Sequence, residues 1–251
     1  MTEILFTNVT LDYPLLGANS RSIRNRILPP RVGGVLNKNE SGVLSVRALD
    51  NIDISFAEGD RVALLGPNGS GKSTLLRVAS GVFQPSSGSV QRKGSIGSLI
   101  DIGLGLNPEA TGRENIFLRA NLLGIKKRDV DDIFVEILSF TGLGEFIDMP
   151  MRTYSSGMQM RLAFALSTVN RPEILLMDEW LSVGDESFRE KAEGRLSNVL
   201  EQSKILVLAS HSRSLVEKLC NRAVWLSGGS VVQDGNILDV TQEYFSWREK
   251  I

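Results

Sequence analysis

The sequence has one cysteine, one histidine and almost no net charge across its 251 residues. The single cysteine, Cys220, excludes an internal disulfide and fits a reducing compartment, and its place in the helical run LVEKLC indicates packing rather than chemistry. A net charge of −1 gives the chain as a whole no electrostatic attraction to nucleic acid. We therefore expect no nucleic-acid partner.

Long apolar runs and a targeting segment are also missing. No stretch approaches the ~20 apolar residues that span a bilayer, and the N-terminus MTEILFTNVT has no basic region ahead of an apolar core, unlike a signal peptide. The composition, 42% hydrophobic and 23% charged, is that of a globular protein with one large core or two small ones. If this chain works at a membrane, we expect another chain to supply the spans.

A glycine-rich turn stands out in residues 64–78, LLGPNGSGKSTLLRV. The apolar run RVALL before it predicts a buried strand, and STLLRVAS after it predicts a helix. The glycines let backbone N–H groups approach an anion, Lys72 offers a charge to the β and γ phosphates, and Ser73 offers a hydroxyl to Mg²⁺. The complete G-x-x-x-x-G-K-S pattern predicts a nucleoside triphosphate site rather than a chance turn. The candidate phosphate-loop residues are Gly66, Pro67, Asn68, Gly69, Ser70, Gly71, Lys72, Ser73 and Thr74.

The order of predicted elements indicates an α/β fold, a P-loop NTPase core with a mostly parallel sheet. Strand-like runs ILFTNVTLDY and ALDNIDISF precede the phosphate loop and predict an N-terminal antiparallel β subdomain, with a polar, basic stretch over 15–45 between them. Thr111 and Glu114 fit a capping box that starts a block of helices before the buried strand EILLMD. We expect one domain over 1–251, with the β subdomain and core at about 1–100 and 171–251 and an inserted helical subdomain at about 108–170.

Two further sites lie at the ends of predicted strands. Asp178 and Glu179 end the strand ILLMDE, where Asp178 could hold Mg²⁺ and Glu179 could orient or deprotonate the attacking water; the alternative is a solvated acidic pair. His211 follows the strand KILVLAS, where it could contact the γ-phosphate or that water. A lone histidine is more often a packed or surface residue, and position alone favours the catalytic interpretation.

A second helix start lies in TYSSGMQMRLAFAL, residues 153–166. Ser155, Ser156 and Gly157 lead into a strong helix, so their hydroxyl and N–H groups could bind an anion, or Ser155 could be a simple N-cap. Since one nucleotide rarely needs two phosphate cradles, the second could serve a nucleotide held by another copy of the chain.

The segments GPNGSGKST, YSSGM and LLMDEWLSVGD, with His211 at its strand end, together resemble the nucleotide-binding subunit of an ATP-binding cassette (ABC) transporter over nearly the whole chain. The resemblance implies that ATP and Mg²⁺ are bound, and that Ser155, Ser156 and Gly157 close over ATP in the opposite subunit of a homodimer. It also implies that Asp185 lies at the dimer seam and that Tyr13 stacks on adenine, although an ordinary strand tyrosine is the alternative for Tyr13.

Departures from the usual family pattern indicate which subfamily the sequence resembles. The usual signature LSGGQ is YSSGM here, and alignment places Asp101 where most members carry a glutamine that senses Mg²⁺. With GLNPEATGRENI and DMPMRTYSSGMQMRLAF, these variants resemble the bacterial exporters of O-antigen, capsule and teichoic acid. Some of these exporters append a glycan-binding domain, which we do not expect after Ile251.

We therefore expect an ATPase that drives export of a lipid-linked polysaccharide through a membrane-spanning permease at the cytoplasmic face of the bacterial inner membrane. The runner-up is a cassette ATPase that moves another cargo such as a lipid, drug or nutrient. A soluble cassette acting on ribosomes or DNA fits less well, because this sequence has neither paired cassettes nor the long coiled coil of such proteins. A simple P-loop kinase also fits less well, because it would leave YSSGM without a function. The basic run 21–31 is either a solvated loop or a contact with lipid headgroups or the permease.

Overall fold

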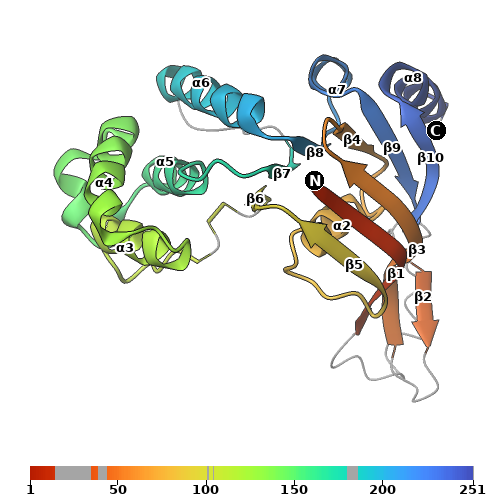
Figure 1. Cartoon of the computed structure of the whole chain (residues 1–251), viewed down its shortest axis with the longest axis horizontal. Helices are drawn as coiled ribbons and strands as arrows, with labels where there is room; N and C mark the ends of the chain where they lie inside the picture. The colour runs from red at the N-terminus through yellow and green to blue at the C-terminus, as the bar shows by residue number, and fades with distance from the viewer. Residues whose placement is uncertain (15–34, 39–43, 101, 104, 180–185, 251) are drawn as a thin grey trace. The chain divides into compact units, whose positions relative to one another are not determined.

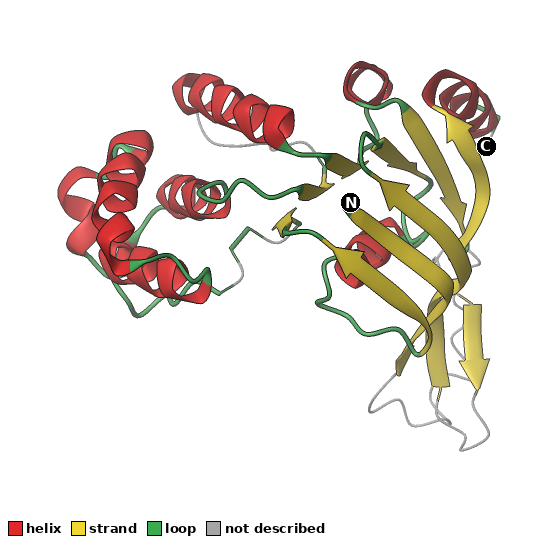
Figure 2. Ribbon diagram, viewed as in Figure 1, coloured by secondary structure: helices red, strands yellow, loops and turns green. Residues whose placement is uncertain are grey.

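The computed structural model divides into two compact units. Strands gather in unit 1, whereas unit 2 is mainly helical (Figure 2). Unit 1 contains the described residues of 1–96, 173–179 and 204–250, and unit 2 those of 97–172 and 186–203. The residues that the structure describes are 1–14, 35–38, 44–100, 102–103, 105–179 and 186–250.

An antiparallel sheet of four strands forms the first layer of unit 1. Its order is β2 (Val35–Lys38), β3 (Leu44–Ala57), β1 (Glu3–Pro14) and β5 (Ser87–Lys93). Alternate residues of β1 such as Ile4 and Phe6 are buried, the period of a strand with one face on a core. The sequence interpretation placed no strand within 15–45, and in this respect it was wrong, because β2 and the start of β3 lie there.

The second sheet of unit 1 carries the phosphate loop. Four of its strands are β9 (Arg222–Ser227), β4 (Arg61–Leu65), β8 (Ile205–Ala209) and β7 (Ile174–Asp178), in this order and parallel to one another. β8 is buried along its whole length and β4 after its first residue, as expected for parallel strands covered on both faces. The expected parallel core is therefore confirmed. Antiparallel β10 (Ser230–Asn236) pairs with β9, and β6 (Ile96–Leu99) begins where unit 1 passes into unit 2.

Three helices pack on these sheets within unit 1. Helix α2 (Lys72–Ala79) contacts β7 and β8 of one sheet and β3 and β5 of the other, and its buried face includes Leu75, Leu76 and Val78. Helices α7 (Arg213–Leu219) and α8 (Ile237–Arg248) lie side by side (Figure 1). Helix α8 also packs on β4, β9 and β10, so the strand that leads into the phosphate loop is covered by the last helix.

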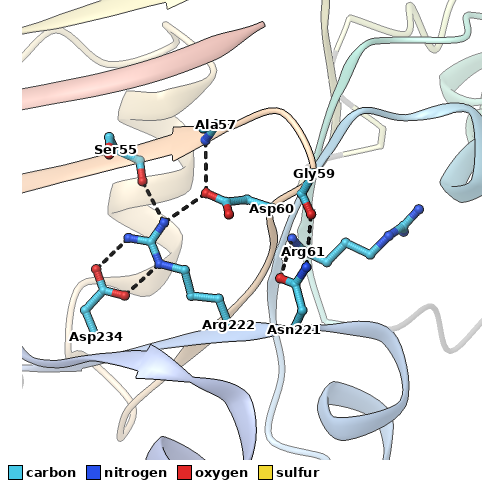
Figure 3. A network of polar contacts seen from close by, with 8 residues as sticks. All are labelled: Ser55, Ala57, Gly59, Asp60, Arg61, Asn221, Arg222 and Asp234. Carbon is cyan, nitrogen blue, oxygen red and sulfur yellow. Dashed lines mark hydrogen bonds and ion pairs between the residues drawn. The ribbon is translucent and has the colours of Figure 1, made fainter.

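A polar network ties β9 and β10 to the start of β4 (Figure 3). The guanidinium of Arg222 pairs with Asp60 at 2.9 Å and Asp234 at 2.6 Å, and donates to the carbonyl of Ser55. The neighbouring Asn221 accepts from the N–H of Arg61 and donates to the carbonyl of Gly59. These bonds satisfy backbone groups at the turn into β4, on which the phosphate loop depends.

Unit 2 is built from four helices around their own core. They are α3 (Gly112–Leu122), α4 (Lys127–Thr141), α5 (Ser156–Ser167) and α6 (Glu186–Gln202), with short 3₁₀ turns at Gly144–Asp148 and Met151–Thr153. Side chains from three of these helices, such as Ile116, Ile137 and Leu162, meet in this core. Within the part of the chain that the structure describes, no helix combines the length and apolarity required to cross a bilayer.

Candidate active site

The phosphate loop adopts the backbone conformations that its glycines were predicted to supply. Gly66, Gly69 and Gly71 have φ values of 146°, 77° and 106°, a region that other residues rarely enter. A Cβ on Gly66 would lie 2.3 Å from the carbonyl oxygen of Leu226, and one on Gly71 would lie 2.7 Å from that of Ala48. The loop therefore requires glycine both for its backbone angles and for its close neighbours.

Lys72 begins helix α2 and turns its side chain back into the loop. The ammonium donates to the carbonyl oxygens of Gly66 at 2.7 Å and Pro67 at 3.0 Å, and the residue is only 8% exposed. Burial lowers the pKa of Lys72, and the charges of Asp178 and Glu179 oppose that shift. The structure thus brings the predicted phosphate-binding cation into the field of the two predicted acids.

Asp178 and Glu179 lie at the carboxyl end of β7, as predicted. The N–H of Glu179 donates to the carbonyl of Ala209 at the end of β8, over 2.8 Å. Glu179 has φ 66°, the left-handed region, which is strained for a side chain of this kind. Strained backbone of this sort is concentrated at functional sites, so the conformation supports a specialised role for Glu179.

His211 and Glu179 line the same pocket, which has a volume of about 500 Å³. Burial lowers the pKa of His211, the charge of Lys72 lowers it further, and Glu179 acts in the opposite direction. Sequence reasoning missed the hydroxyl groups around this histidine, although the run SHSRS shows them. Ser210, Ser212 and Ser214 line this pocket together with Lys218.

Tyr13 reaches the phosphate-loop helix from β1. Its hydroxyl lies 3.3 Å from Oγ1 of Thr74, and its ring makes an edge-to-face contact with Phe83 at 5.7 Å between centroids. These contacts fix the ring beside the first turn of α2.

The predicted signature segment starts helix α5 in unit 2. Ser155 is the N-cap and its hydroxyl accepts from the N–H of Met158 at 3.2 Å, so the cap that the sequence offered as the alternative is present. Ser155 and Ser156 are exposed, and Gly157 is half-buried. This leaves the start of α5 accessible to a ligand or to another chain.

Some predicted residues lie outside the described part of the chain. These are Asp101, Asp185 and the basic run 21–31.

The residues present fit a nucleoside triphosphate with Mg²⁺. The glycine cradle, the ammonium of Lys72 and the N-terminus of α2 suit phosphate oxygens. The hydroxyl of Ser73 and the carboxylate of Asp178 are hard oxygen ligands, and Mg²⁺ in such sites takes one or two carboxylates together with substrate phosphates and water.

Comparison with known proteins gives a consistent picture. The family model described as ABC transporter matches residues 49–182. The chain is 45% identical to the O-antigen export system ATP-binding protein RfbE of Yersinia enterocolitica over 93% of this chain and 98% of that protein. It is 43% identical to the teichoic acids export ATP-binding protein TagH of Bacillus anthracis over 81% of this chain but only 37% of that protein.

A solved structure supports the fold. The chain matches a dimeric ATP-binding cassette in a post-hydrolysis state bound to ADP and Pi, with a TM-score of 0.66, 23% identity, and coverage of 93% of this chain and 98% of that chain. The fold of this chain is therefore one already known among ATP-binding cassettes.

Proposed function

The chain belongs to the ABC transporter family, and we propose that it is the ATPase subunit that powers export of a lipid-linked polysaccharide. The observation that carries the ATPase assignment is that Lys72, in the loop after β4, lies in the field of Asp178 and Glu179 at the end of β7, with only β8 between the two strands. Full-length similarity to an O-antigen export ATP-binding protein supports the polysaccharide cargo. The protein binds ATP, and hydrolysis is its reaction.

Each group at the site has a role in that reaction. Lys72 and the N–H groups of the phosphate loop bind the β and γ phosphates and stabilise the charge that develops during transfer. Glu179 orients the attacking water or takes its proton, while His211 contacts the γ-phosphate. Ser73 and Asp178, with Asp101 as a further candidate, would hold Mg²⁺, which supplies neutralisation of phosphate charge when bound. Tyr13 stacks on the adenine ring.

Two copies of the chain complete the site. The helix start at Ser155, Ser156 and Gly157 binds the nucleotide held by the phosphate loop of the second copy, and Asp185 lies at the seam between the copies. Contacts to phosphate from both copies exist only in the closed dimer, so ATP shifts the population toward closure and hydrolysis reverses the shift. This cycle converts binding free energy into movement of a partner.

The partner is a membrane-spanning permease that carries the lipid-linked glycan. The chain would bind it at the cytoplasmic face of the bacterial inner membrane, as a peripheral subunit.

The variant Glu179→Gln tests this proposal. It should bind ATP normally, hydrolyse it at a rate lower by at least about a hundredfold, and accumulate as a dimer during sedimentation with ATP. Wild-type turnover in this variant would remove Glu179 from its role. Co-purification of the tagged chain from membranes should yield a permease, and accumulation of lipid-linked polysaccharide in cells that lack the chain identifies the cargo. A different accumulated cargo, or a ribosome as partner, would overturn the export assignment.

A further inference from the structure

Tyr154, the first residue of YSSGM, is buried, and its hydroxyl donates one hydrogen bond to the backbone and lies close to the start of helix α3. The residue is 6% exposed and belongs to the core of unit 2. Its hydroxyl donates to the carbonyl of Phe146 at 2.7 Å. Burial raises the pKa of Tyr154, and the nearby backbone of Gly112 acts in the opposite direction. The hydroxyl therefore lies between the 3₁₀ turn that contains Phe146 and the start of helix α3 at Gly112.

Gly112 shows how close this approach is. It is the first residue of α3, where backbone N–H groups have no partner within the helix. A Cβ at Gly112 would lie 2.4 Å from the Tyr154 hydroxyl and 2.9 Å from Cδ1 of Ile147. Gly112 and Tyr154 are thus complementary. Because glycine has no side chain, the phenol hydroxyl of Tyr154 can lie close to the backbone of Gly112.

The same two segments are joined by further bonds. The N–H of Met151 donates to the carbonyl of Ala110 and that of Arg152 to the carbonyl of Pro108, each over 2.9 Å. The guanidinium of Arg113 also pairs with Asp148, at 2.6 Å. Residues 108–113 and 146–154 therefore form one connected layer, of which the Tyr154 hydroxyl is the last link before the signature serines.

The signature helix begins directly after this link. Ser155 is the N-cap of α5, and the side-chain amide of Gln159 donates to the carbonyl oxygens of Tyr154 and Met151, both at 3.3 Å. Tyr154 is fixed by its ring, its hydroxyl and its carbonyl. Because Ser155 is the next residue, its position depends on all three.

We propose that Tyr154 is a positioning residue for ATP hydrolysis, which holds Ser155, Ser156 and Gly157 in place for the nucleotide of the second copy through its link to Gly112. This inference rests on the proposed function, since it assumes that the signature segment binds that nucleotide. The leucine that the family usually carries at this position has no hydroxyl and could not make the link. The departure from the usual signature is then a second way of fixing the same helix start.

The first test replaces Tyr154 with Phe in the full chain, which removes the hydroxyl and keeps the ring. We expect kcat for ATP to fall on the order of tenfold, because small displacements of positioning groups have effects of this size or larger. KM for ATP should remain within about twofold, because the phosphate loop is unchanged. Thr141→Val is the matched control. Thr141 is another buried hydroxyl of unit 2, but it bonds within its own helix α4, to the carbonyl of Ile137 at 2.8 Å.

The second test uses the match between tyrosine and glycine. Gly112→Ala should lower both kcat and thermal stability, because the new methyl group meets the hydroxyl. Combining it with Tyr154→Phe removes the hydroxyl, and the far end of Ile147 can then move. The double variant should lose less kcat than the product of the two single effects. Strictly multiplicative losses would show that the two residues act independently and would overturn the proposal.

A measurement of ATP-driven dimerisation distinguishes a positioning role of Tyr154 from an effect of the substitution on stability. In the Glu179→Gln background, Tyr154→Phe should weaken the ATP-bound dimer about tenfold in sedimentation, whereas Thr141→Val should leave its dissociation constant unchanged. Equal effects of the two variants on kcat and dimer affinity would reduce Tyr154 to a packing role. A wild-type chain that hydrolyses no ATP refutes the proposed function itself; an active wild type with fully active Tyr154→Phe refutes only this inference.

Discussion

The ammonium nitrogen of Lys72 lies 2.7 Å from the carbonyl oxygen of Gly66, six residues earlier in the chain. The loop's own backbone thus holds the cation inside the loop. The site also disfavours the charge, because burial lowers the pKa of this lysine. A charge proposed to bind phosphate thus lies where burial disfavours it, as is common at functional sites.

Replacing Lys72 with Met should therefore separate activity from stability. ATP hydrolysis should fall by at least about a hundredfold, because a charge contact to the transferred phosphate is lost. Thermal unfolding of the nucleotide-free protein should occur at an equal or higher temperature, because a buried cation is replaced by an apolar chain of similar length. Turnover near the wild-type rate would contradict the role of Lys72.

The pKa of His211 can be measured directly, because it is the only histidine in the chain. NMR titration of the nucleotide-free protein should give a midpoint below the usual value of about 6.5, since burial and Lys72 both disfavour the imidazolium. Lys72→Met should raise the midpoint and Glu179→Gln should lower it further. As pH falls, the unfolded chain takes up this proton first, so the contribution of His211 to stability declines below about pH 6.5. A midpoint above the usual value would contradict the structure.

Local signals explain which parts of the site could be predicted from the sequence. The backbone conformation of the loop requires positive φ at Gly66, Gly69 and Gly71, and this requirement can be recognised from the spacing of the glycines. The capping box at Thr111 is equally local, and both of its hydrogen bonds with Glu114 are present.

Features that depend on tertiary packing could not be predicted from the sequence. β2 is four residues long, too short for an alternation to be visible within a polar stretch. The Tyr154 hydroxyl bonds to the carbonyl of Phe146 and lies against Gly112, and only the packing of unit 2 brings these residues together. Tyr154 could be recognised in the sequence as a departure from the family pattern, but its contacts could not.

Arg222 should contribute measurably to stability without affecting nucleotide binding. Its side chain is 24% exposed and pairs with Asp60 and Asp234, which are 25% and 30% exposed. Arg222→Met should lower the free energy of unfolding in urea by about 2 kcal/mol, because two partly buried carboxylates lose their partner. Lys93→Ala is the control, since Lys93 is 61% exposed beside Glu3 and such surface pairs contribute little. Equal effects of the two changes would contradict the network's role.

Cys220 should be unreactive in the folded protein. The residue is 8% exposed, and burial raises the pKa of its thiol to about 12, so almost no thiolate exists at neutral pH. Ellman's reagent at pH 8 should leave the native chain unmodified, whereas in urea it should release one equivalent per chain. Rapid labelling of the native chain would show that the end of α7 opens readily.

The left-handed backbone of Glu179 predicts a conflict between stability and activity. Asn tolerates φ near 66° better than Glu or Gln does, because its short side chain can bond to the local backbone. Glu179→Asn should therefore be more stable than Glu179→Gln, by up to about 1 kcal/mol in urea unfolding. Both variants lose the carboxylate, so both should be inactive, and the difference between them isolates the backbone from the charge. If the two variants unfold at the same urea concentration, the conformation at residue 179 stores no strain, and the strand end is an ordinary turn that carries the proposed water-activating carboxylate.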